Sequence, residues 1–250
     1  MHFHLPKPLH GWREFAGEVG IIVLGVLIAL AAGQIVEDIH QRTELRDAEA
    51  AMMSELRDDD LPQAFTRAAI YDCYSNQLDA IEQAVASGDR SRLLTLARAY
   101  QPIVRTWDDQ AWQAALASQV LVSAGSDRML GWSTAYIMIP VLARGTTSEQ
   151  DEVPQLWASI SGSGPLSAAQ QDRLFQIVSQ LRRYNRAMAG AALIFSNDVR
   201  AQGLTLSRDA KAALLSQARA KYGRCVHEVS PEKLNMNGQI TVISAPLGTN

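Results

Sequence analysis

The stretch that decides the fold runs from Val19 to Val36 and reads VGIIVLGVLIALAAGQIV, without a charged residue. As a helix rising about 1.5 Å per residue it is roughly 27 Å long, close to the thickness of the hydrocarbon core of a bilayer. Glu18 precedes the stretch, and Glu37 and Asp38 follow it. We therefore expect residues 19–36 to form one transmembrane helix, with the lipid bilayer as its first partner.

Two aromatic residues lie just before this span. Trp12 and Phe15 are at the position where aromatic side chains favour the membrane interface, so we interpret them as interface anchors within an N-terminal interfacial segment, residues 1–18. The alternative is a cleaved secretory signal, since small residues suited to cleavage occur near Ala31. Glu14 and Glu18 argue against a signal, because the segment before a signal's apolar core is rarely acidic.

Small residues recur every four positions within the span, at Gly25, Ala29 and Gly33. This spacing forms one stripe on a helix and lets a second membrane helix approach closely. The stripe therefore predicts helix packing with a second copy of this chain or with another membrane protein. The alternative is that small residues are simply common in membrane helices.

The charges that flank the span barely decide its orientation. Lys7 and Arg13 precede it, whereas Arg42 and Arg46 follow it. The amino terminus and the early histidines tilt the balance towards an N-terminus inside, which would place most of the chain on the outer side. There, Cys73 and Cys225 are compatible with a disulfide, although two buried thiols are equally compatible.

The overall composition excludes several classes of protein. The 250 residues include 23 Lys and Arg against 26 Asp and Glu, a formal net charge of −3, which excludes a globally basic nucleic-acid binder. A hydrophobic fraction of 47% with two cysteines also excludes a disordered chain and a disulfide-dense mini-protein. We expect no nucleic-acid partner.

Beyond the span, the pattern is helical. We expect an all-α fold in which the transmembrane helix continues as a stalk to about Asp58, breaks at Asp60, and leads into an antiparallel helical bundle. The helical soluble domain would cover residues 37–223, and residues 224–250 would form an extended tail. Further helices are expected at about 70–87, 90–101, 103–122, 127–143, 167–203 and 207–223, with turns at 123–125 and 145–148.

The longest soluble helix has the clearest signals. Ser167 and Gln170 have the spacing of a capping box, and Gly203 is expected to end the helix. Between them, apolar residues alternate by four and three positions, which indicates a buried seam. The seam residues are Leu174, Val178, Leu181, Asn185, Met188, Ala192, Phe195 and Val199.

No catalytic motif occurs in the chain. There is no phosphate-binding glycine loop, nucleophile elbow, zinc-protease helix or kinase signature. His40 and His227 are the only histidines after the span and lie on separate segments. We therefore expect no enzyme activity, no cofactor and no metal.

Trp107, Asp108 and Trp112 form the most unusual local group. The two indoles could line a pocket or contact a partner. Alternatively, Asp108 caps a helix while the indoles fill the core, which is the interpretation we favour.

Arg182, Arg183 and Arg186 surround Asn185 on the longest soluble helix. A basic stripe could bind an anion or an acidic partner, but a solvated helix face is the more ordinary interpretation. Asn185, within the seam, is expected to set helix register.

The N-terminal region also resembles a known family. The segments WREF (12–15), GEV (17–19) and IVLGVLIAL (22–30), followed by Gln34 and Glu37, are similar to the N-terminus of a family of uncharacterised single-span bacterial membrane proteins. The resemblance covers residues 12–42 and implies a bacterial inner membrane, in which the orientation expected from the flanking charges would make the soluble domain periplasmic. It implies no activity and no functional residue.

Three hypotheses of function follow. The first is an accessory subunit or self-associating scaffold of a membrane complex. The second is a periplasmic sensor or ligand-binding module that signals through a partner, by analogy of fold alone. The third is an unrecognised enzyme, for which Asp108 and Asp109 would be the first residues to test.

Overall fold

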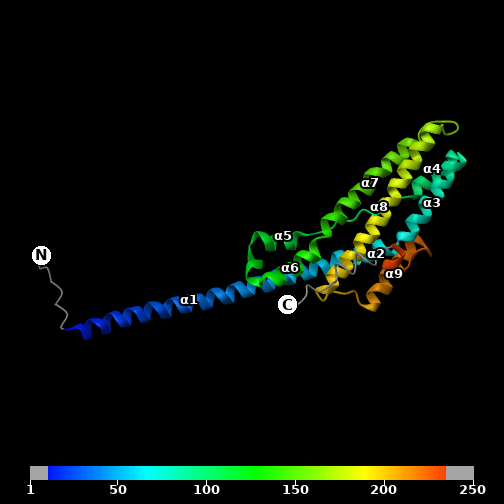
Figure 1. Ribbon diagram of the computed structural model, residues 1–250. Coiled ribbons are helices and arrows are strands. Elements are labelled where there is room, and N and C mark those ends of the chain that lie inside the picture. Colours follow the sequence, from blue (N-terminus) through cyan, green and yellow to red (C-terminus); the bar gives the residue numbers. More distant parts are fainter. Residues whose placement is uncertain (1–10, 235–250) are drawn as a thin grey trace, which may run out of the picture. The chain divides into compact units, whose positions relative to one another are not determined.

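The computed structural model describes residues 11–234, and every regular element in that part of the chain is helical (Figure 1). The chain divides into two compact units, Met1–Asp47 and Ala48–Asn250. The first helix, α1 (Trp12–Ser54), supplies the described part of the first unit. Residues 19–36 of α1 are exposed throughout, and α1 is the one described helix long and apolar enough to cross a membrane.

The second unit consists of short and long helices that bury a common core. After the last residues of α1 come η1 (Glu55–Asp60), α2 (Leu61–Ala69), α3 (Tyr71–Ser87), α4 (Arg90–Ala99), α5 (Gln110–Ala117), η2 (Val120–Ala124), α6 (Ser126–Tyr136), α7 (Ile139–Ile160), α8 (Ala168–Ala201), α9 (Arg208–Tyr222) and η3 (Pro231–Leu234). Helix α8 is central, because α2, α3, α6 and α7 all pack against it (Figure 1).

The seam expected on the longest helix is confirmed. All eight of its residues are buried on α8, and Leu174 and Leu181 belong to a core cluster with Leu78 of α3, Leu93 of α4 and Leu156 of α7. The capping box at Ser167 and Gln170 is also confirmed, as is the helix stop at Gly203, where a positive φ angle suits glycine. Gly88 ends α3 in the same way.

The expected helix break at Asp60 is wrong. Six residues of π-helix, Glu55–Asp60, follow α1 directly and lead into α2 without a gap. Pro62 lacks an N–H and therefore removes one hydrogen bond of the regular α-helical pattern. The helix does not end there, because the residues before Pro62 form a π-helix. Asp60 makes no side-chain capping bond, because its carboxylate is directed at a distant segment.

The expected helix over residues 103–122 is also wrong at its start, since helix forms only from Gln110. Two backbone N–H groups of the preceding segment donate to other parts of the chain instead. Ile103 donates to the Tyr74 hydroxyl at 3.0 Å, and Asp108 donates to Asp60 Oδ1 at 3.3 Å. Tertiary acceptors thus satisfy donors that a local helix would have used.

The expected turn at 145–148 lies inside α7, and the expected helix over 127–143 is divided between α6 and α7, with Pro140 in the first turn of α7. Gly145 does not end a helix. It allows α7 to approach α8, because a Cβ at this position would overlap the sulfur of Met188. Helices α7 and α8 lie side by side in Figure 1.

Candidate functional site

The small-residue stripe of α1 is open. A Cβ placed on Gly25 or Gly33 would meet no described atom within 4 Å. Near the beginning of the same helix, the Trp12 and Phe15 rings contact each other, with centroids 6.0 Å apart, and both are exposed. Residues 19–36 of α1 are therefore an exposed apolar surface in the part of the chain that the structure describes.

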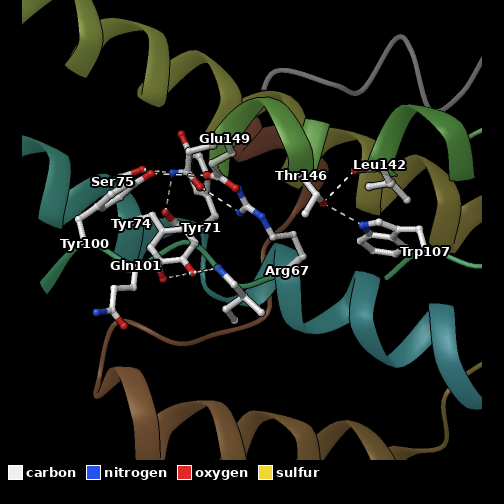
Figure 2. Close-up of polar contacts among 12 residues, drawn as sticks. Arg67, Tyr71, Tyr74, Ser75, Tyr100, Gln101, Trp107, Leu142, Thr146 and Glu149 are labelled. Carbon is white, nitrogen blue, oxygen red and sulfur yellow. Dashed lines mark hydrogen bonds and ion pairs between the residues drawn. The ribbon is translucent and has the colours of Figure 1, made fainter. Parts of the chain in front are cut away.

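The structure directs the two tryptophans of the Trp107–Trp112 group to different places. Trp107 donates its indole N–H to Thr146 of α7 at 2.9 Å, and its ring meets Phe195 edge-on (Figure 2). Trp112 stacks on Tyr136 of α6, with ring centroids 5.5 Å apart. The two indoles therefore pack against separate helices and do not line one pocket.

Asp108 does not cap α5. The cap position belongs to Asp109, whose side chain makes no capping hydrogen bond. Asp108 instead contributes its backbone N–H to Asp60.

The three arginines of the basic stripe have separate surroundings. Arg182 forms ion pairs of 2.7 Å with both Asp79 and Glu82 of α3, and these carboxylates raise the pKa of its guanidinium. Arg183 hydrogen-bonds Ser179 and Gln180 of its own helix. Arg186 is exposed. Arg182 thus connects α8 to α3, and the three side chains do not converge on one site.

A buried ion pair that the sequence analysis missed lies at the centre of the second unit. Arg67 of α2 and Glu149 of α7 are 3.1 Å apart, and each side chain is 3% exposed (Figure 2). Tyr100 donates its hydroxyl to the same carboxylate at 3.5 Å, and the Arg67 guanidinium lies over the Tyr74 ring. A charged residue between the buried Ala64 and Ala68 of α2 was the available sequence signal.

Asn185 completes this polar cluster. Its Oδ1 accepts from Arg67 at 3.0 Å, and its Nδ2 donates to the Tyr71 carbonyl and to Ser75 Oγ of α3. Both groups of the buried amide are therefore satisfied, by residues from two different helices. The contacts fix how α2 and α3 sit against α8, which agrees with a role in register.

The π-helix itself carries a second polar group, the buried Asp60 and the half-buried Glu55. Asp60 is fully buried, one of its oxygens has no hydrogen-bond partner in the described structure, and burial raises its pKa to about 7. The nearby Glu55 accepts hydrogen bonds from the Tyr136 hydroxyl at 2.8 Å and from the Ala111 N–H at 2.9 Å. This arrangement can hold a proton on Asp60 near neutral pH.

Asp198 of α8 is another buried carboxyl. Neither of its oxygens has a hydrogen-bond partner within the part of the chain that the structure describes, and burial raises its pKa to about 6. Over residues 11–234 there is no group of three His, Cys, Asp or Glu side chains that could hold a metal ion. The early histidines lie outside the described residues.

Cys73 of α3 and Cys225, just after α9, form a disulfide. It closes a sequence separation of 152 residues, with the two Cα atoms 5.1 Å apart. Val226 and Tyr222 beside it pack on the main core. The bond therefore ties the end of the second unit to its centre.

Comparison of the chain with known proteins gives no similarity from which to transfer a role: no family model, no curated protein and no solved structure matches it.

Proposed function

We propose that this chain is a non-catalytic, single-span membrane protein that acts as an accessory subunit or self-associating scaffold. The observation that carries the proposal is the apolar segment of α1, none of which is buried. Such a surface needs lipid or another protein to cover it. The open faces of Gly25 and Gly33 offer a second helix the close approach on which membrane association depends.

The proposal extends to topology. Disulfides persist in oxidising compartments, so the Cys73–Cys225 bond supports a second unit outside the cytoplasm, and the resemblance over residues 12–42 supports a bacterial inner membrane. The soluble part would be periplasmic. The short connection at residues 161–167 between α7 and α8 supports an antiparallel bundle.

The test replaces glycines of the stripe in the full chain. Gly25→Leu and Gly33→Leu keep the span apolar but hold an apposed helix away, so recovery of a second copy or of a co-purifying membrane protein should fall several-fold. Gly20→Leu is the matched control, because Gly20 lies on the opposite side of α1 and is equally open. Recovery is measured by mass spectrometry of complexes extracted directly with their lipid.

A wild-type chain that is monomeric in lipid, with nothing co-purifying, would refute the proposal. Equal losses for all three variants would also contradict it, since the stripe would then have no special role.

A further inference from the structure

A cavity of about 410 Å³ lies in the second unit, between α2, α8, the start of α9 and the chain just before η3. Its wall is mainly apolar and includes Leu61 and Phe65 of α2, Leu193 of α8 and Val229. A volume near the low end of the roughly 300–1,000 Å³ typical of ligand sites suits a small or single-chain ligand. None of the tryptophans or arginines that the sequence singled out lines it.

The charged residues of the cavity leave one positive charge uncompensated. Lys211 is paired with Glu228 at 2.7 Å and also lies over the Phe65 ring. Arg200 of α8, which also lines the cavity, has no ion pair or side-chain hydrogen bond within residues 11–234. The same holds for the amide of Asn197, one helical turn before it. The exposed guanidinium of Arg200 and the side-chain amide of Asn197 thus both line the apolar cavity.

We propose that this cavity binds a single acyl chain with an anionic head group, such as a medium-chain carboxylate. The acyl chain of the ligand would lie against Leu61, Phe65 and Leu193, where its apolar surface is removed from water. The head group would pair with Arg200 and accept a hydrogen bond from Asn197, since guanidinium–carboxylate bonds are the stronger kind. This site goes beyond assembly through α1 and does not depend on it.

The test uses decanoate as the probe and the full chain in nanodiscs of zwitterionic lipid. Binding is measured by calorimetry, with empty nanodiscs subtracted. Arg200→Gln should weaken decanoate binding at least tenfold, and Arg200→Lys should recover part of the loss. Arg186→Gln is the matched control, because Arg186 is exposed on the same helix and does not line the cavity. Decyltrimethylammonium, with the same chain and the opposite charge, should bind far more weakly than decanoate.

The source of the ligand is separated by a second set of nanodiscs. If anionic phospholipid replaces the zwitterionic lipid and lowers the apparent affinity for decanoate in the wild type, a phospholipid that inserts one of its two acyl chains competes for the cavity. Unchanged affinity indicates that the ligand is a free carboxylate. Either result supports the site.

Two results would overturn the proposal. The first is decanoate binding that is absent, or equal in wild type and Arg200→Gln. The second involves residues 235–250, which follow the cavity-lining Pro231 in the sequence after three further residues. If the full chain does not bind decanoate but a chain ending at Leu234 does, the occupant is the chain's own end. Both readouts are independent of oligomer recovery, so this proposal and the proposed function can fail separately.

Discussion

At the scale of single residues, two sets of buried polar groups differ in how their hydrogen bonds are satisfied. Arg67, Glu149 and Asn185 satisfy one another, and removing any one would leave a charge or amide without its partner inside the core. Asp60 and Asp198 instead keep oxygens without a hydrogen-bond partner in the described structure. A neutral carboxyl costs less there than a carboxylate, which is why both pKa values rise.

The raised pKa of Asp60 predicts that the free energy of unfolding depends on pH, and Asp60→Asn should remove this contribution. The pKa of Asp60 is 3.8 when exposed and about 7 in the fold, so the folded state holds the proton more tightly. Its contribution to stability is complete below pH 4 and is lost as the pH rises through 7. The whole loss is at most about 4 kcal/mol, of which at most about 3 kcal/mol falls between pH 5 and pH 8. Thermal unfolding followed by tryptophan fluorescence at pH 5 and pH 8 measures it.

Asparagine stays neutral, so the variant should lose less stability than the wild type between the two pH values. Asp198 titrates in both proteins, and its effect cancels in the comparison. If wild type and Asp60→Asn lose the same stability over this range, Asp60 is ionised in the fold and the prediction is wrong.

At the scale of the elements, two local exceptions set how the helices meet. The π-helix at Glu55–Asp60 leads α1 into α2 and directs Asp60 at the segment before α5. Gly145 removes one side chain where α7 crosses Met188 of α8. Packing determines both features. Asp60 does not break the helix and Gly145 does not form a turn, although their local sequences favour these.

Gly145→Ala should therefore destabilise the protein, by about 1–3 kcal/mol, although alanine is the better helix former. The added Cβ has to displace the buried Met188 side chain. Gly131→Ala in α6 is the matched control. There the new Cβ meets only the end of the flexible Gln202 side chain, so we expect no loss or a small gain. The prediction is tested by comparing the thermal unfolding midpoints of Gly145→Ala and Gly131→Ala with that of the wild type.

A pair of variants with equal midpoints would show that Met188 moves aside without cost. The close approach of α7 and α8 would then not depend on glycine.

At the scale of the whole molecule, the disulfide is a covalent constraint between distant parts of the second unit. The Cys73–Cys225 bond encloses most of the second unit, and a loop of 152 residues corresponds to about 5 kcal/mol in the chain-entropy model. Because the bond restricts the unfolded chain, its removal should lower stability without changing the native helices.

Cys73→Ser with Cys225→Ser should lower the unfolding midpoint by about 10–20 °C while the helical circular dichroism signal is kept. Wild type treated with a reductant should behave in the same way. In the cell, protein trapped with a thiol reagent should show no free thiol if the second unit is outside the cytoplasm. Two free thiols in freshly trapped protein would contradict both the bond and the proposed topology.

The sequence by itself determined whatever depends on neighbours along the chain. The uncharged run at residues 19–36, the seam of α8 and the capping box at Ser167 are all local patterns, in which periodicity and side-chain chemistry select a helix and its ends. The bare stripe of α1 belongs here too, because an exposed helix has no packing to override its pattern.

Only the tertiary structure decided which distant groups meet. The pairing of Arg67 with Glu149, the partners of Trp107 and Trp112, and the cysteine bond each join segments far apart in sequence. The failed expectations at 103–109 and Gly145 have the same origin, because contacts with other segments outweighed local preferences worth about 1 kcal/mol or less. The failure at Asp60 is different, since there the chain continues past Pro62 as a helix by widening into a π-helix. The cavity beside Arg200 depends on the tertiary structure as well, because it arises from three separate helices that no local pattern connects.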